Sequence, residues 1–439
     1  MTSLSLWTVG VGGRTLILVI GTLNLIVLAR ALAPSGRGQY FLFVSVLLVL
    51  ATIADLGISQ SAVVFAGRHG LRVAAMHRVL VRYAALFAFV VCTGGALTLL
   101  VAGDALVPNL PRDWWLGVFI AVPLMVYSNF WIAMMVGLRH IASVTGVQVA
   151  AAAISLAGNL AFVAPSGSTA TAVLLYVAVL ALQVLAMFWL QRRVVAKPGE
   201  AQDDPRGLER EMMLFGLRGY PNSLGMLLWS RTPVFVLNAY HGPAAVGVYS
   251  IAQTLAERVL LPLQSLQDLL YNRMTQLPPA EATQTMNRYL RIGTALILPI
   301  VAVAIVVSPA LVTLLFSDDF DRAAAALRLL LVGTAVVTVP ALLSTYFLGQ
   351  MGRPGLISIL SGLRGGGQIV LLLLLVPALA EVGTAVAVLT WQIIGTVVTL
   401  ALYVRFAKTD LRSALVLRRG DLALLKEQVF HMLGRGKAP

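Results

Sequence analysis

Eight charged side chains lie inside long apolar runs of the sequence, where a charge is costly. These residues are Arg14, Asp55, Arg218, Arg231, Glu257, Arg258, Asp268 and Arg364. A charged group in lipid usually faces a cavity or a partner side chain. Arginines outnumber acids here, whereas a cavity for cationic drugs would favour acids and aromatic rings. Because guanidinium groups offer paired donors that match phosphate oxygens, the pattern predicts a cavity for a phosphate or pyrophosphate group.

Two neighbouring apolar runs carry the charges nearest to the predicted membrane midplane. We expect Arg231 and Arg258 to bind an anionic substrate group, and Glu257 to set their charge balance or relay a proton. Gln264 adds a polar side chain to the same run. The alternative is a buried ion-pair cluster that only fixes the packing of the helices.

The remaining intramembrane charges have both a substrate-binding and a structural interpretation. Arg14 and Asp55 lie at similar depth and could pair, although Arg14 could instead snorkel to the interface, and Asp55 could stabilise a local kink with Gly57. Arg218 occupies an early position in the seventh run, as Arg14 does in the first. Arg364 stands among glycines that allow either a cavity or close helix approach.

Other kinds of chemistry have no support in the sequence. It contains neither a Walker A loop nor an H-E-x-x-H motif, and its histidines show no metal-binding spacing. Asp318, Asp319 and Asp321 are interpreted as a solvated helix cap, and the single cysteine, Cys92, as a packing residue. We therefore predict no catalytic residues, no metal, no cofactor and no enzymatic activity.

The composition requires a solvent other than water. Of 439 residues, 59% are hydrophobic and 11% are charged, whereas soluble domains carry about 25% charged residues. The net charge of +14 would suggest nucleic acid in a soluble protein. Here the basic residues lie mostly between apolar runs, so we expect contact with anionic lipids and no nucleic-acid partner.

The apolar runs predict an all-α integral membrane protein with about twelve transmembrane helices in two six-helix lobes around a central cavity. The predicted spans are Val11–Ala33, Tyr40–Ala66, Val79–Ala102, Trp114–Val136, Ile141–Ala164, Thr169–Leu190, Met212–Ala239, Ala244–Tyr271, Ile292–Phe316, Ala323–Leu348, Leu356–Val376 and Val382–Phe406. With the N-terminus inside, 22 basic residues fall on the cytoplasmic side and five on the external side. That asymmetry follows the positive-inside rule and predicts that both termini are cytoplasmic.

The longest connection divides the chain into two halves. We predict an N-terminal lobe over 1–190, a cytoplasmic linker over 191–211, a C-terminal lobe over 212–406 and a basic cytoplasmic tail over 407–439. Each lobe opens with a helix, a short turn containing proline and glycine, and a Gly-x-Tyr start to the next helix, at Gly38 and Gly247. Leucines spaced along the tail predict an amphipathic helix on the inner membrane surface, with a poorly ordered tail as the alternative.

Short motifs in both halves resemble the polysaccharide biosynthesis proteins, a family that includes the O-antigen flippases of the multidrug/oligosaccharidyl-lipid/polysaccharide exporter superfamily. The motifs are Leu28-Ala29-Arg30-Ala31-Leu32, Gly38-Gln39-Tyr40, Ala54-Asp55-Leu56-Gly57-Ile58 and Gly247-Val248-Tyr249-Ser250-Ile251-Ala252. Asp55 matches the acid of the family's Asp-Leu-Gly stretch. The arginines match the family only as a residue type.

The resemblance implies a flippase that moves a lipid-pyrophosphate-linked oligosaccharide across the bacterial plasma membrane by alternating access. It implies the lipid-linked oligosaccharide and membrane lipids as partners, with a polysaccharide polymerase or glycosyltransferases as further candidates. One alternative is a cation-coupled small-molecule exporter of the same superfamily, whose deep site should be acidic. Another is a membrane glycosyltransferase, polymerase or ligase, which usually needs a larger external loop than any found here.

Overall fold

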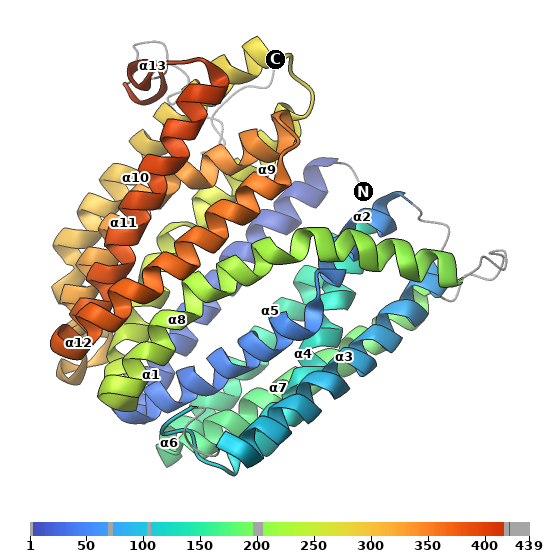
Figure 1. The fold of residues 1–439 in the computed structure, drawn as a ribbon. Helices are drawn as coiled ribbons and strands as arrows, with labels where there is room; N and C mark the ends of the chain where they lie inside the picture. Colours follow the sequence, from blue (N-terminus) through green and yellow to red (C-terminus); the bar gives the residue numbers. More distant parts are fainter. Residues whose placement is uncertain (1–2, 69–72, 103–106, 196–204, 417–420, 422–439) are drawn as a thin grey trace. The chain divides into compact units, whose positions relative to one another are not determined.

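The computed structural model describes residues 3–68, 73–102, 107–195, 205–416 and 421, and every regular element among them is a helix (Figure 1). The elements are α1 (Ser3–Asp55), α2 (Ile58–Arg68), α3 (Val73–Ala102), α4 (Trp114–Gly137), α5 (Ile141–Gly158), η3 (Asn159–Val163), α6 (Ala164–Ser166), α7 (Thr169–Val195), α8 (Pro205–Val259), α9 (Leu261–Met274), α10 (Pro279–Phe316), η4 (Asp318–Phe320), α11 (Ala323–Thr345), η5 (Tyr346–Gln350), α12 (Pro354–Ala407) and α13 (Leu411–Leu415).

Three of these elements are pairs of helices joined at one residue with non-helical dihedral angles. The junctions are Ala33 in α1, Gly242 in α8 and Ala380 in α12. Each lies at or within a few residues of the connection predicted between two consecutive spans. Counting each pair as two helices, all twelve predicted spans fall on helices of the structure.

Within the described residues, eight helices are long and apolar enough to cross a membrane. The segments Gly12–Asp55 in α1 and Pro354–Ala407 in α12, of 44 and 54 residues, have the length for two crossings each. Helix α8 is not among the eight. It carries the predicted spans with the charges nearest the midplane, so its polarity agrees with the pattern seen in the sequence.

Three predicted spans differ in detail from the helices observed. The second span is interrupted, because α1 ends at Asp55 and α2 begins at Ile58 after a tight turn. The eighth span breaks at Leu260, before the proline of α9. The ninth span begins earlier than predicted, since α10 starts at Pro279 and continues as a polar helix before its apolar part. Hydropathy detects only the apolar part of such a helix.

Contacts divide the chain into two compact units, the first comprising Met1–Ser250 and Thr313–Phe320. In this unit α4 packs against α2, α3, α7 and α1. Phe43 is fully buried there, and the rings of Trp114 and Tyr176 meet it edge-on at centroid distances of 6.3 and 6.1 Å. The predicted linker over 191–211 falls partly outside the described residues, and the division into lobes that it predicts remains a prediction.

The second unit comprises Ile251–Val312 and Asp321–Pro439. Its core joins α9, α10, α11 and α12, and the rings of Tyr346 and Tyr403 meet at right angles within it, 5.1 Å apart. The Tyr403 hydroxyl donates a hydrogen bond of 2.7 Å to the Asn287 side-chain oxygen. Of the predicted tail helix, the structure describes the short helix α13, while residues 422–439 lie outside the described residues.

Candidate functional site

The first unit brings the two Gly-x-Tyr junctions of the sequence into direct contact. A methyl group added at Gly38 would overlap the carbonyl oxygen of Pro243, and one added at Gly247 would overlap the carbonyl oxygen of Pro34. The contact is therefore reciprocal, and it joins backbone to backbone. Only glycine permits such an approach, since any Cβ atom would push the two backbone segments apart.

A second close contact joins the second predicted span to the start of the seventh. The backbone at Gly57, in the turn after α1, lies directly against Gly216 of α8. Beside it, the buried Ser61 hydroxyl donates a 2.6 Å hydrogen bond to the carbonyl oxygen of Met212. Within this unit, the junction after the first predicted span thus contacts the junction after the seventh, and the second span contacts the start of the seventh.

Two arginines lie against one aromatic ring next to the first of these contacts. The guanidinium carbon of Arg231, on α8, is 5.7 Å from the centroid of Phe41, on α1. The guanidinium carbon of Arg37 is 5.8 Å from the same centroid and 5.6 Å from that of Tyr40. Arg37 is buried and Arg231 is half-buried. We call Arg37, Phe41 and Arg231 the Phe41 cluster.

The Phe41 cluster has the chemistry of an anion site. A cation over an aromatic face gains about 0.5–2 kcal/mol, which helps to hold each guanidinium group in place. Two guanidinium groups close to one ring give this part of the first unit a positive charge, which attracts an anion. A phosphate or pyrophosphate group can accept paired hydrogen bonds from each.

Arg37 was not recognised as a site residue from the sequence. Its position in a short polar connection led to its being counted among the external basic residues. Its spacing to Tyr40 and Phe41, three and four residues later, places all three on one face of a helix, which was the available signal. Arg231 was named from the sequence, and the structure places it against Phe41; its role in substrate binding remains a prediction.

Asp55 and the other charges of the first unit have different surroundings. The Asp55 carboxylate accepts hydrogen bonds from the Gly57 backbone nitrogen, at 3.0 Å, and from the Ser59 hydroxyl. It therefore stabilises the turn between α1 and α2, as the kink interpretation requires. Arg14 on α1 and Arg218 on α8 are exposed. Their substrate-binding roles remain predictions.

The charged pair predicted at the midplane of the eighth span lies in the second unit. Glu257 is exposed, and its carboxylate accepts a 2.8 Å hydrogen bond from the side-chain nitrogen of Gln253. Arg258 is half-buried. The backbone of Gln264 lies in α9, but its side chain is outside the described residues, as is that of Asp268. The roles predicted for these residues remain predictions.

Arg364 packs across the two halves of α12. Its Nη2 atom donates to the Thr399 hydroxyl at 3.1 Å and to the Gly395 carbonyl oxygen at 3.4 Å. The aliphatic part of its side chain lies on Gly395, where a Cβ atom would collide with it. Nearby, the Trp391 ring covers Gly367. These contacts agree with close helix approach, and a role in substrate binding remains a prediction.

Within the described residues, no group of three or more histidine, cysteine, aspartate or glutamate side chains is placed to hold a metal ion. The polar groups of the Phe41 cluster are guanidinium groups, which do not ligate metal cations.

Comparison with known proteins gives a family and a fold. A family model described as polysaccharide biosynthesis protein matches residues 5–264. No curated protein matches the chain. Among solved structures, an inward-facing multidrug resistance MATE family transporter of the MOP superfamily is similar with a TM-score of 0.67, at 15% identity over 89% of this chain and 94% of that one.

Two further structures give the same result. A MATE structure in complex with MaL6 has a TM-score of 0.63, at 15% identity over 92% of this chain and 96% of that one. A MOP superfamily transporter from Pyrococcus furiosus, described by its reversed binding-pocket polarity, has a TM-score of 0.61 at 15% identity, over 91% and 93% of the two chains. The predicted all-α membrane fold is confirmed by these likenesses.

Proposed function

Because the chain belongs to the polysaccharide biosynthesis protein family, we propose that it is a flippase for a lipid-pyrophosphate-linked oligosaccharide in surface polysaccharide synthesis. It is a multi-pass membrane transporter with the fold of the MOP superfamily. The observation that carries the finer proposal is the Phe41 cluster, in which Arg231 of the seventh predicted span and Arg37 of the connection before the second span lie against one ring. The membrane is proposed to be the bacterial plasma membrane, with both termini in the cytoplasm.

In the proposed mechanism, the pyrophosphate group enters from the cytoplasmic side and binds Arg231 and Arg37. Arg14 would contact it along its path, the sugars would occupy the polar interior, and the lipid chain would stay in the bilayer. Transfer then requires one of the two backbone contacts of the first unit to open while the other stays closed. The contacts at Gly38 and at Gly57 are the two places where this would occur.

The energy for the cycle must come from outside the chain's own chemistry, because the sequence carries no Walker A loop. A membrane potential or an ion gradient is proposed to bias the step, since moving one charge through 100 mV is worth about 2.3 kcal/mol. Enzymes that assemble or polymerise the lipid-linked sugar are the proposed functional partners.

A second candidate is a cation-coupled small-molecule exporter, which the likeness to the multidrug resistance MATE family transporter favours. The two proposals differ in the charge of the ligand. A cluster with two guanidinium groups repels an organic cation and attracts a pyrophosphate, so the ligand's charge discriminates between them.

Ligand binding to the purified full chain tests the proposal. Polyprenyl pyrophosphate and tetraphenylphosphonium would be titrated against the wild type and the double variant Arg37→Gln/Arg231→Gln. Loss of two charge-assisted hydrogen-bond donors should weaken pyrophosphate binding at least about tenfold. The matched control is Arg82→Gln/Arg192→Gln, which removes two exposed arginines of the same unit and should leave binding unchanged.

The two ligands give opposite results under the two proposals. Tight binding of tetraphenylphosphonium by the wild type, with no effect of the double variant on polyprenyl pyrophosphate, would favour the exporter and remove the Phe41 cluster from the mechanism. Binding of the pyrophosphate alone, lost in the double variant, supports the flippase.

A further inference from the structure

A basic cavity lies in the second unit, outside the region matched by the family model. It has a volume of about 1020 Å³ and is bordered by the first turns of α10, the end of α12, Ser413 of α13, and Asp421. Three basic side chains and one acidic side chain line it, so its wall carries an excess of positive charge. In the predicted topology this end of α10 faces the cytoplasm.

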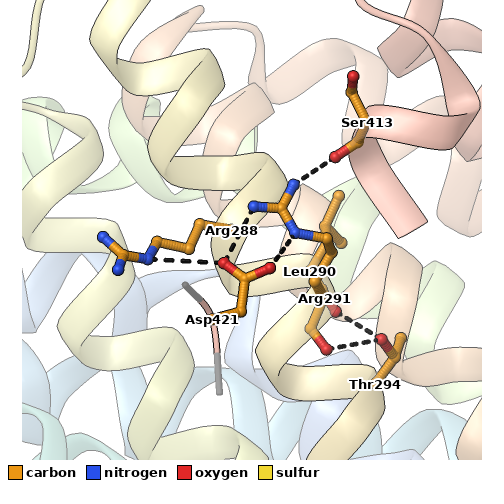
Figure 2. Close-up of polar contacts among 6 residues, drawn as sticks. All are labelled: Arg288, Leu290, Arg291, Thr294, Ser413 and Asp421. Carbon is orange, nitrogen blue, oxygen red and sulfur yellow. Dashed lines mark hydrogen bonds and ion pairs between the residues drawn. The ribbon is translucent and has the colours of Figure 1, made fainter. Parts of the chain in front are cut away.

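One arginine of the cavity is fully engaged in holding its wall. Arg291 is buried, and its Nε and Nη2 atoms donate to the two carboxylate oxygens of Asp421 at 2.6 and 3.1 Å (Figure 2). Its Nη1 atom donates to the Ser413 carbonyl oxygen. The bidentate pair fixes Asp421 against α10, and the bond to Ser413 fixes α13, so Arg291 is not the residue that would bind an added ligand.

The other two basic side chains are placed to receive a ligand. Arg288 approaches Asp421 through its Nε atom, at 3.7 Å, and in Figure 2 its terminal nitrogens point away from that carboxylate. Its side chain is 44% exposed. Lys408 is exposed at the left-handed end of α12. Within the part of the chain that the structure describes, neither Arg288 Nη atom nor the Lys408 amine has a hydrogen-bond partner.

The rest of the lining suits a phosphate group close to a lipid surface. Thr285 and Gln284 line the cavity and add polar side chains, whereas the Thr283 hydroxyl donates to the Pro279 carbonyl oxygen. Phe406, exposed and apolar, lines the same cavity. Phosphate oxygens can accept from arginine, lysine and hydroxyl donors together, whereas a sugar without charge would not use the two cations.

We propose that this cavity binds a phosphate-bearing anion through Arg288 and Lys408. The phosphate of an anionic phospholipid headgroup and a free phosphate ion present the same chemistry, and the experiment separates them. This site is distinct from the Phe41 cluster, so its failure would leave the proposed transport function unaffected. A bound ligand would lie between the start of α10 and the end of α12. Arg291 of α10 already holds the segment that follows α12, through its bonds to Ser413 and Asp421.

The test is native mass spectrometry of the full chain in detergent, titrated with dioleoyl phosphatidate. The variant Arg288→Gln/Lys408→Gln should weaken binding about tenfold, the effect of losing charge-assisted hydrogen bonds. The matched control is Arg405→Gln/Arg412→Gln, which removes two exposed cations close in sequence that do not line the cavity. Its affinity should stay within about twofold of the wild type.

Two further titrations, with inorganic phosphate and with dioleoylglycerol, show whether the ligand is a lipid headgroup or free phosphate and whether a phosphate group is needed for binding. Displacement of phosphatidate by millimolar inorganic phosphate would assign the site to free phosphate, whereas resistance to it would assign the site to a lipid headgroup, and both support the proposal. Equal loss in the two double variants, no loss in either, or equal binding of dioleoylglycerol, which lacks phosphate, would overturn it. The melting temperature without lipid should be the same for all three proteins.

Discussion

The two junctions that contact each other in the first unit reach one backbone geometry with different residues. At the first, Ala33 has φ 52° and ψ 177° and precedes Pro34. At the second, Gly242 has φ 72° and ψ −174° and precedes Pro243. Glycine adopts this region freely, whereas for alanine it costs about 1–3 kcal/mol.

This difference shows that the type of residue at a junction does not by itself cause the bend. Because an alanine adopts the same conformation, local preference alone cannot produce the first bend. The reciprocal approach of Gly38 to Pro243 and of Gly247 to Pro34 supplies the tertiary constraint. We infer that the backbone contact holds both junctions, and that the first of them retains strain.

The largest effect is expected from breaking the contact itself. Gly38→Ala and Gly247→Ala each place a Cβ atom onto a backbone carbonyl group of the other junction, so each should destabilise the protein by about 3 kcal/mol. The measurement is the melting temperature in detergent. Gly94→Ala is the control, since an added methyl group there meets no atom within 4 Å. Similar melting temperatures for all three variants would contradict a close contact.

A smaller loss of stability is expected from a substitution at the second junction. Gly242→Ala forces alanine into the conformation that Ala33 already adopts, so it should destabilise the protein by about 1–3 kcal/mol. An unchanged melting temperature would mean that the second junction does not have the geometry described here.

Near each junction, one side chain forms hydrogen bonds to a neighbouring segment, and the two should contribute different amounts to the stability of the protein. Asn238, which is buried, donates a 2.6 Å hydrogen bond to the Pro108 carbonyl oxygen, while the exposed Arg30 donates to the carbonyl oxygens of Leu314 and Leu315. Asn238→Ala should cost about 1 kcal/mol, and Arg30→Ala less, because water replaces its bonds. Denaturation of the two variants side by side measures the order, and the reverse order would contradict it.

One substitution is expected to have the opposite sign and to stabilise the protein. Ala33→Gly removes the strain at the first junction but adds about 0.5–1 kcal/mol of backbone entropy to the unfolded chain. The net result should be a stabilisation of about 1 kcal/mol, seen as a higher melting temperature. A loss of stability would show that Ala33 is not strained, and the comparison between the junctions would fail.

The fold was largely predictable from the sequence because lipid imposes long apolar runs on each span. All twelve runs correspond to helices, and the Gly-x-Tyr repeats pointed to related junctions. The mutual contact of those junctions was not predictable, since nothing in a single sequence relates Gly38 to Gly247 in space. The early start of α10 was missed because a polar helix continuing beyond the bilayer has no hydropathy signal.

The candidate site was only partly predictable, because the sequence alone does not show which side chains meet in the folded chain. Arg231 stood out because an arginine inside an apolar run is costly and needs an explanation. Arg37 did not, because it lies in a short polar connection that the folded chain buries against Tyr40 and Phe41. Asp421 lies in the predicted tail and Arg291 in the connection before the ninth predicted span, and only the folded structure pairs them.

The most direct test of the account is transbilayer movement of a polyprenyl-pyrophosphate-linked oligosaccharide in liposomes that contain the purified full chain. The wild type and Arg82→Gln/Arg192→Gln should move the lipid at the same rate, and Arg37→Gln/Arg231→Gln should reduce that rate at least about tenfold. Equal rates in all three proteins, at equal reconstituted amounts, would contradict the claim that the Phe41 cluster receives the pyrophosphate.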